Sequence, residues 1–417
     1  MEGLEIPSHF LCPISLEMMR DPVTLPTGIT YDRQSIEGWL FDRKQSTCPA
    51  TRQQLPADVA VTPNHTLRRL IQAWCTLHSS DGVERIPTPR LPIGQDQVAA
   101  LLDAAARPST QVDALRKLRQ ISAESERNRR CVAATPGAVD ALARVIILSA
   151  ASSDTEIDQD LILTSNSTAC DEALVVLQSL QISGDQLLDL VARNGNLVGS
   201  LTAVLRRSNH QSRSYAILIL KSVLAVVSPT RLMSLPQELF DEVVGVIRDG
   251  VSPQATKAAL RALAGACPWG RNRAKAVAAG AVHAMVELLL EEPERRTCEA
   301  TLAALASVCG SAEGRAELVR HQAAVAVVSK KILRVSQLAS EKAVRILHQL
   351  ARHAATAALL REMAQVGAVM KLCMVVQAGV GGKTEERARE ILRMHARTWR
   401  NSPCVSPLFT NGFSTSK

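Results

Sequence analysis

The sequence predicts a mainly α-helical chain in which a small α+β module precedes an all-α array of helical repeats. Three observations favour this fold class. Hydrophobic residues make up 46% of the 417 residues but aromatic residues only 3%, so Ala, Leu and Val form most of the apolar mass, and Ala and Leu favour helices over strands. A short apolar phrase recurs at a nearly constant interval beyond residue 95. The residues before it contain turns and short extended segments instead.

A hairpin and two helices are expected in the first module. In "VTLPTGITYD", residues 23–32, a Pro-Thr-Gly turn separates two short extended segments, which indicates a β-hairpin. Asp32 is the expected N-cap of a first helix and Asn64 of a second one. The apolar faces of these helices are expected to carry Ile36, Trp39 and Leu40 on the first, and Leu67, Leu70, Ile71 and Trp74 on the second.

Four phrases identify this module, residues 5–79. They are "F-x-C-P-I-S-L-E-x-M-x-D-P-V", "G-x-T-Y-D-R-x-x-I-x-x-W-L", "C-P-x-T" and "P-N-x-x-L-R-x-L-I", in this order. The module resembles the U-box, the metal-free relative of the RING finger found in ubiquitin ligases. A RING needs eight Cys and His ligands in four pairs, whereas residues 1–78 offer only Cys12, Cys48, Cys75, His9, His65 and His78, with no CxxC pair. We therefore expect no metal and no cofactor.

Hydrogen bonds must then hold the two loops that zinc would fix with about 10–16 kcal/mol. The polar residues expected to form this network are Ser15, Glu17, Thr47, Thr51 and Arg52.

The resemblance also implies a partner and a mechanism. In the family, the two loops and the central helix form a shallow apolar groove for a ubiquitin-conjugating enzyme charged with ubiquitin. The contact positions of the family motif correspond here to Ile14, Leu16, Trp39 and Pro49. Arg52 matches the cationic position that holds the thioester in a reactive pose, so catalysis would be positional and non-covalent. From spacing alone, these residues could equally be ordinary core residues and a surface charge.

Residues 80–95 are expected to form a linker. The stretch "DGVERIPTPRLPIGQ" carries three prolines and two glycines, which disfavour a continuous helix or strand.

Beyond the linker, two phrases repeat in step. The apolar phrase ends at Leu118, Leu180, Leu220, Leu263, Leu305 and Leu350, with intervals of 62, 40, 43, 42 and 45 residues. The second phrase, "NRRCVAATPGAV" at 128–139 and "NRAKAVAAGAV" at 272–282, is a helix that ends at a glycine before a new apolar helix. A period in the low forties is typical of a helical solenoid, and the second phrase resembles armadillo repeats.

About six repeats and part of a seventh are expected within residues 96–400. The long first interval reflects an acidic insertion near 149–168, expected to be a loop, and phosphorylation of this insertion is left open. Residues 404–417 are expected to be disordered.

The repeats are expected to hold a protein substrate on their concave side. Armadillo proteins that carry nuclear-import signals present a ladder of Asn residues there. The equivalent positions are occupied here by Lys117, Ser179, Ile219, Ala262, Ala304 and Gln349. An import function is therefore not expected, and a role as a simple spacer remains an alternative.

Charge and composition indicate which other classes of partner, such as nucleic acid or a membrane, are not expected. The net charge is +8, but the basic residues are scattered at helical spacing, with only Tyr215, Phe240 and Trp269 as aromatic residues between 100 and 398. Nucleic-acid binders usually combine basic runs with aromatic side chains, so no nucleic acid is expected. Ten cysteines without a CxxC pair, no signal peptide and no long apolar stretch predict a soluble protein of the cytoplasm, or of the nucleus, without an integral membrane segment.

These features together predict an E3 ubiquitin ligase. The U-box would recruit the charged conjugating enzyme and the repeats the substrate. The closing phrase "HARTWRNSPCV", 395–405, resembles that of a short plant subgroup linked to immune and stress signalling. The alternative is a non-catalytic armadillo adaptor whose U-box serves only for docking or dimerisation. A homo-oligomer is left open.

Overall fold

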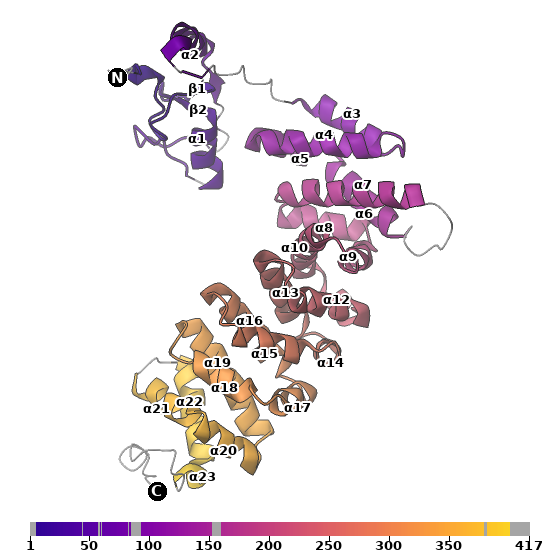
Figure 1. The fold of residues 1–417 in the computed structure, drawn as a ribbon, viewed down its shortest axis with the longest axis vertical. Helices are drawn as coiled ribbons and strands as arrows, with labels where there is room; N and C mark the ends of the chain where they lie inside the picture. Colours follow the sequence, from indigo (N-terminus) through magenta and orange to yellow (C-terminus); the bar gives the residue numbers. More distant parts are fainter. Residues whose placement is uncertain are drawn as a thin grey trace. The chain divides into compact units, whose positions relative to one another are not determined.

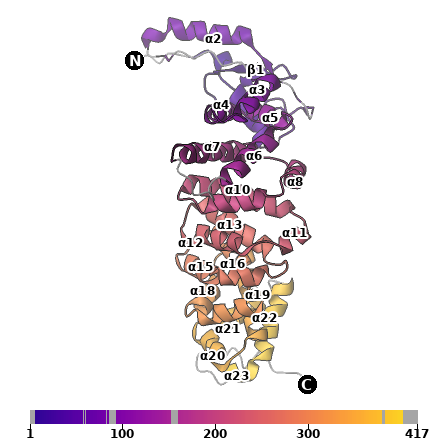
Figure 2. The same cartoon turned by 90° about the vertical axis from the view of Figure 1, so that its right-hand side faces the viewer.

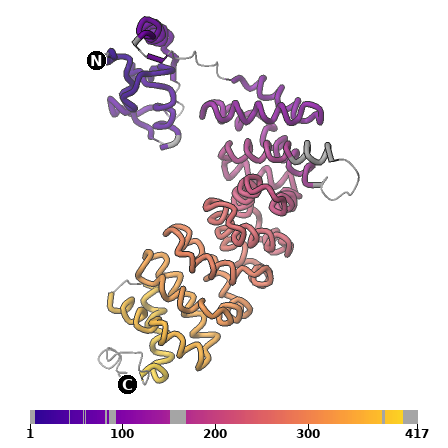
Figure 3. The backbone as a smooth tube through the Cα atoms, in the orientation of Figure 1, coloured from indigo at the N-terminus to yellow at the C-terminus, as the bar shows by residue number. Residues whose placement is uncertain are grey.

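The computed structural model describes residues 6–43, 45–56, 59, 61–81, 83–84, 93–151, 160–378 and 382–400. The chain divides into two compact units, Met1–Ala100 with Gln120–Thr135, and Leu101–Arg119 with Pro136–Lys417. Figures 1 and 3 trace the chain through both units. The predicted linker and C-terminal tail fall largely outside the described residues.

The first unit contains a small antiparallel sheet of three strands, β1 (Pro22–Thr24), β2 (Thr30–Asp32) and β3 (Thr62–Pro63), in the order β2-β1-β3. Val23 pairs with Tyr31 on one side and with Pro63 on the other, so the predicted hairpin is confirmed. The third strand was not expected, because two residues are too short to show the alternating pattern of a strand.

The short helices of this unit are η1 (Ser8–Phe10), α1 (Arg33–Glu37), η2 (Gly38–Asp42), α2 (His65–Leu77) and η3 (Ser79–Asp81). Asn64 caps α2 as predicted, since its side chain accepts from the Leu67 N–H at 3.0 Å. Leu70, in contrast, is 52% exposed, while Ile71 and Cys75 enter the core. The first predicted helix is α-helical only to Glu37 and continues as the π-helical turn η2.

Asp32 does not act as the predicted helix cap. It stands at the N-cap position of α1 but makes no capping hydrogen bond there. Its Oδ1 accepts instead from the backbone N–H groups of Arg20 and Asp21, at 2.8 and 3.0 Å. The cap prediction is therefore wrong, because a carboxylate can bond any nearby backbone donor and here the preceding loop supplies two.

Helices make up the rest of the described chain. They are α3 (Gln95–Ala105), α4 (Gln111–Glu124), α5 (Glu126–Ala134), α6 (Ala138–Ala151), α7 (Asp160–Ser179), α8 (Gly184–Arg193), α9 (Leu197–Leu205), α10 (His210–Val226), α11 (Pro229–Met233), α12 (Gln237–Arg248), α13 (Pro253–Ala266), α14 (Asn272–Ala278), α15 (Ala281–Leu290), α16 (Arg295–Val308), α17 (Ala312–Arg320), α18 (Ala324–Lys331), α19 (Gln337–His353), α20 (Ala357–Gln365), α21 (Ala368–Gln377), α22 (Gly382–Met394) and α23 (Ala396–Arg400).

The helices of the second unit repeat in threes. From α8 onward, each group has a short first helix, a second helix and a long third helix. The third helices α7, α10, α13, α16, α19 and α22 contact one another in succession, and so do the second helices α6, α9, α12, α15, α18 and α21. Figure 2 shows these layers following one another along the unit. From Leu180 onward, the recurring apolar phrase lies on, or directly after, these third helices, as the period predicts, and its first copy, ending at Leu118, lies on α4.

The second recurring phrase has a physical explanation. Its Asn272 is fully buried and donates to the carbonyls of Leu232 at 2.7 Å and Ala266 at 2.9 Å. One amide thereby satisfies the carbonyls of two preceding helices, α11 and α13. The glycine of the phrase, Gly280, has φ +81°, which confirms the predicted left-handed cap.

The acidic insertion is only partly a loop. Helix α6 extends to Ala151 and α7 already begins at Asp160, so the predicted loop is wrong for residues 149–151 and 160–168. Adding residues to an existing helix gains one hydrogen bond per residue, so a polar segment can extend it. Residues 152–159 lie outside the described part of the chain.

Among the described residues, no single helix has the length and hydropathy of a membrane span; α5 and α6 reach that threshold only when combined, and they are bent by 81°.

Candidate functional site

Two six-residue loops, 12–17 and 48–53, share one hydrogen-bonding pattern. The Cys12 N–H donates to the Glu17 carbonyl at 2.8 Å, and the Leu16 N–H returns to the Cys12 carbonyl at 2.8 Å. The second loop repeats this pattern, from Cys48 to the Gln53 carbonyl at 2.9 Å and from the Arg52 N–H to the Cys48 carbonyl at 2.8 Å. Isolated β-bridges close both loops, Leu11 with Met18 and Thr47 with Gln54.

The fifth residue of each loop has a left-handed backbone. Leu16 has φ +59° and Arg52 has φ +57°. This conformation is uncommon for any residue other than glycine, and for a leucine or an arginine it is strained. Both side chains point into solvent: Leu16 is 74% exposed, and Arg52 is exposed as well. Two different side chains, one apolar and one cationic, therefore occupy equivalent strained positions.

Strand β2 holds both loops through their cysteine thiols. The Tyr31 hydroxyl lies 3.1 Å from the Cys48 sulfur and accepts from the Ala50 N–H at 3.1 Å. The next residue, Asp32, donates its N–H to the Cys12 sulfur at 3.3 Å. Both cysteines and Tyr31 are almost completely buried. Two adjacent residues thus fix both loops to the same strand.

Hydrogen bonds also change the acidity of these thiols. Burial acts to raise the pKa of Cys48, but hydrogen bonds from Thr27, Thr51 and Tyr31 outweigh it and lower the pKa to about 6. Burial and the Cys48 sulfur together raise the pKa of Tyr31 above its usual range. For Cys12, burial likewise acts to raise the pKa, and the hydrogen bonds that its sulfur accepts outweigh it and lower the pKa. Each sulfur therefore acts as an acceptor.

An ion network ties the helices to the sheet. Asp21 receives Arg33 of α1 at 2.6 Å and Arg68 of α2 at 2.9 Å, and Arg33 also lies 3.5 Å from Glu37. All four side chains are at most 17% exposed. Burial raises the pKa of Glu37, and the charge of Arg33 opposes this rise. Removing one partner of such a pair leaves an uncompensated buried charge.

The predicted contact residues fall into two groups. Leu16 and Arg52 are exposed and, among the described residues, their side chains have no hydrogen-bond or ionic partner. Ile14 and Trp39 are half-buried against the core cluster, and Pro49 is half-exposed in the second loop. The Trp39 indole N–H donates to the Thr47 carbonyl at 2.8 Å, which links η2 to the second loop.

The predicted hydrogen-bond network is partly wrong. Ser15 and Thr51 do contribute side-chain oxygens, which accept from the backbone N–H groups two residues later, at 3.4 Å in both loops. Glu17, Thr47 and Arg52 contribute main-chain atoms alone to the hydrogen bonds among the described residues. Sequence reasoning missed Tyr31 and the role of the two thiols. Only the matching Cys-Pro dipeptides at the start of both loops could have indicated the thiols.

The armadillo helices carry no asparagine ladder at the positions compared above. Ile219, Ala262 and Ala304 are buried, with at most 5% exposure. These positions therefore cannot bind the backbone of an extended peptide as an amide side chain would.

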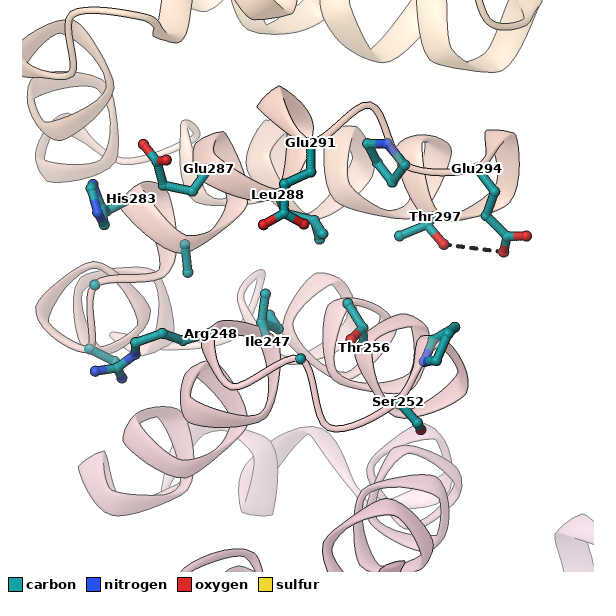
Figure 4. A pocket seen from close by; sticks show the side chains of 16 residues that line it. Ile247, Arg248, Ser252, Thr256, His283, Glu287, Leu288, Glu291, Glu294 and Thr297 are labelled. Carbon is teal, nitrogen blue, oxygen red and sulfur yellow. Dashed lines mark hydrogen bonds between the residues drawn. The ribbon is translucent and has the colours of Figure 1, made fainter. Parts of the chain in front are cut away.

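The second unit also contains a cavity of about 540 Å³ between the turn of α12 and α13 and the turn of α15 and α16. Figure 4 shows His283 and Glu287 at one end of it and Glu294 at the other.

Comparisons with known proteins agree with this description. The U-box domain family matches residues 6–80, and the plant U-box protein ARM repeat region matches residues 97–415. E3 ubiquitin-protein ligase PUB23 of Arabidopsis thaliana is 50% identical over 410 residues, covering 97% of this chain and 96% of the relative. E3 ubiquitin-protein ligase PUB22 of the same plant is 46% identical over 425 residues, covering 97% of both chains.

The fold is also found among solved structures. One from work on the interaction between cadherin and beta-catenin has a TM-score of 0.58 at 14% identity, covering 79% of this chain and 59% of that chain. At this identity the likeness concerns the fold alone. The matches over residues 6–80 and 97–415, and the full-length relatives, lead to one conclusion: the chain belongs to the plant U-box proteins that carry an armadillo-repeat region.

Proposed function

We propose that the two loops and Trp39 form the docking surface for a ubiquitin-conjugating enzyme charged with ubiquitin, and that the armadillo repeats hold the protein substrate. Membership of the family makes the chain an E3 ubiquitin-protein ligase. The observation that carries the docking proposal is the pair of matched loops, which hold Leu16 and Arg52 exposed on a strained, hydrogen-bonded backbone.

Catalysis in this proposal is positional. Cys12 and Cys48 are buried to 1% exposure or less and accept hydrogen bonds, so neither thiol is accessible as a nucleophile. Arg52 has an exposed guanidinium that can bond carbonyl groups of two partners at once. Its contribution would be to restrict the orientations of a tethered ubiquitin, so that a substrate lysine attacks the thioester more often.

Substrate binding is proposed for the face formed by the third helices. These helices contact one another in succession from α7 to α22, so they present one continuous surface. Its positions differ in chemistry from repeat to repeat, with Ser179 and Gln349 among them. Such a surface suits a folded or irregular protein partner better than a repetitive peptide.

A reconstituted ubiquitination assay tests the docking surface. It contains ubiquitin, activating enzyme, a panel of conjugating enzymes and the full chain. Leu16→Ala and Arg52→Ala are the informative variants, because both side chains are exposed and their loss leaves the core intact. The matched controls are Leu77→Ala, which removes a 77% exposed leucine from α2, and Arg69→Ala on the same helix.

We expect chain formation to fall at least tenfold in both loop variants and to stay unchanged in both controls. Trp39→Ala should also be inactive, but it is less specific because it also removes the bond to Thr47. Full activity of both loop variants would contradict the docking surface. If the wild type forms no ubiquitin chains with any conjugating enzyme of the panel, the non-catalytic adaptor is favoured instead.

We also propose a cytoplasmic, and partly nuclear, location and a role in plant immune and stress signalling. These rest on the resemblance of the closing phrase at 395–405 and on the plant relatives. Imaging of a fluorescent fusion, and the immune response of plants lacking the gene, test them. An exclusively secreted fusion, or an unchanged response, would contradict them.

A further inference from the structure

Three potential metal ligands meet between two neighbouring repeats of the second unit. His283 and Glu287 lie one turn apart on α15, and His321 lies in the turn between α17 and α18. Their ligand atoms all lie within 4.8 Å of one another. The His321 Nε2 is 3.1 Å from the Glu287 Oε1, and the two imidazole rings are 5.2 Å apart at 41°. The ligase mechanism uses none of these residues.

We infer that His283, Glu287 and His321 form a binding site for a zinc ion. Residues four apart on a helix project on the same side, so His283 and Glu287 can reach one ion together. Zinc accepts imidazole nitrogen and carboxylate oxygen at about 2.0–2.2 Å, and three protein ligands leave a position for water. Two imidazoles favour zinc and its transition-metal neighbours over calcium and magnesium, which prefer oxygen ligands.

The surroundings of the cluster suit a dication. His283 and Glu287 line one end of the cavity seen in Figure 4, which provides room for water ligands and access from solvent. The His321 side chain is 16% exposed and Glu287 50% exposed, so small side-chain rotations can bring the ligand atoms together around one ion.

The tautomer of His321 has to change when the metal binds. The Nδ1 of His321 accepts a long hydrogen bond of 3.3 Å from the Ala323 N–H, so in the neutral ring Nε2 carries the proton and donates it to Glu287. A zinc ion at Nε2 replaces this proton, and the ring gives up the contact with Ala323.

Zinc would connect two successive repeats. His283 and Glu287 belong to the group of α14, α15 and α16, and His321 to the group of α17, α18 and α19. An ion bound only by the folded array stabilises it against unfolding. The inference does not depend on the docking proposal, because the ligands lie in the repeats and the docking loops in the U-box.

Calorimetric titration of the full chain with ZnCl₂, after removal of any affinity tag, tests the site. We expect one zinc ion per chain, and an affinity at least tenfold lower in Glu287→Gln and in His321→Gln. The matched controls are Glu291→Gln, which changes the carboxylate directly after the end of α15, and His353→Gln, which changes an exposed histidine of α19. Both controls should bind zinc like the wild type, and MgCl₂ should not bind.

Cobalt as a spectroscopic probe distinguishes this site from adventitious binding to cysteines. Nitrogen and oxygen ligands give weak visible bands without the intense near-ultraviolet thiolate band. A thiolate band, unchanged zinc affinity in Glu287→Gln and His321→Gln, or no zinc binding by the wild type would each overturn the inference. In the last case the cluster is only a hydrogen-bonded contact between repeats, and His321→Gln then lowers the melting temperature equally with and without zinc.

Discussion

In the U-box, the side chain of Tyr31 connects strand β2 to the second loop. Its hydroxyl lies between the Cys48 sulfur and the Ala50 N–H, and its neighbour Asp32 holds the Cys12 sulfur. A metal ion would fix such loops by coordinating thiolates. Here the same sulfur atoms act as hydrogen-bond acceptors.

We expect Tyr31→Phe to destabilise the U-box by about 1–3 kcal/mol, because the Ala50 N–H loses its acceptor and the Cys48 sulfur a hydrogen-bond donor. Hydrogen exchange of the segment 46–54 should rise in the variant. Tyr215→Phe, in the second unit, is the control and should leave this exchange unchanged. Equal protection in Tyr31→Phe and wild type would contradict the role of the hydroxyl.

The stability of the second loop should depend on pH through Cys48. Its folded pKa of about 6 lies below the usual thiol value, so the folded state binds fewer protons than the unfolded state. The stabilisation is full above the unfolded pKa of about 8.5 and is lost as the pH falls through about 6. Protection of segment 46–54 should therefore increase from pH 6 to about 8.5 in the wild type. Parallel pH profiles for wild type and Cys48→Ser would contradict this titration.

The sequence predicted which residues matter in the two loops, but not the contacts that hold those loops. Leu16 and Arg52 were identified because the family motif carries them. The role of Tyr31 could not be predicted, because it depends on a contact with Cys48, 17 residues away, which forms only after both loops have closed. The predicted helix cap at Asp32 was wrong for a related reason. The carboxylate could bond either the first N–H groups of α1 or those of the preceding loop, and the local sequence pattern favours α1, whereas the structure shows the loop.

At the scale of elements, the period of the sequence repeat predicted more of the helices than the local helix and strand propensities did. The interval of about 42 residues located the long third helices, because each must bury the same apolar positions against its neighbours. The strand β3, the π-helical turn η2 and the early start of α7 were missed. Each is short or polar and owes its form to tertiary contacts rather than to a sequence pattern.

Two helical glycines should respond in opposite ways to substitution by alanine. A Cβ at Gly314 on α17 would lie 2.3 Å from the Val308 carbonyl oxygen, so Gly314→Ala should destabilise the array by about 1–3 kcal/mol. A Cβ at Gly265 on α13 meets nothing within 4 Å, and Gly265→Ala should stabilise it by about 0.4–1 kcal/mol. Denaturant unfolding of both variants checks this. The same sign of change in both would contradict the packing argument.

As a whole molecule, the second unit behaves as a stack in which each repeat contacts its neighbours. Its last described layer is closed by Trp399, which is 1% exposed and donates to the Leu360 carbonyl at 2.9 Å. His395, one turn earlier, reaches the Ala351 carbonyl at 2.9 Å. The closing phrase that resembles the plant subgroup thus also has a structural role.

Trp399→Ala should loosen the array from its C-terminal side. Removing this side chain costs about 3–5 kcal/mol locally, and nearest-neighbour coupling confines the effect to adjacent repeats. Hydrogen exchange should rise in α20 and α22 and stay unchanged in α9 and α10. A uniform rise across all repeats would contradict the nearest-neighbour description.

Ligase activity should be indifferent to chelators. The loops that we propose as the docking surface are held by hydrogen bonds from Tyr31 and Asp32 rather than by an ion. Adding EDTA after the ATP-dependent charging of the conjugating enzyme, so that magnesium is no longer needed, should leave ubiquitin transfer unchanged. A zinc-dependent RING ligase, which should lose activity, provides the control. Loss of transfer both by the wild type and by His321→Gln, in which the proposed zinc site of the repeats is impaired, would overturn the metal-free account of the loops.

The two left-handed residues have a consequence for variant libraries. A glycine at position 16 or 52 would relieve backbone strain of roughly 1 kcal/mol or more, at the loss of the side chain. In a library sorted for cellular abundance, Leu16→Gly and Arg52→Gly should therefore be enriched. In the same library sorted for ubiquitin transfer they should be depleted. These two positions would separate selection for folding from selection for function within a single experiment.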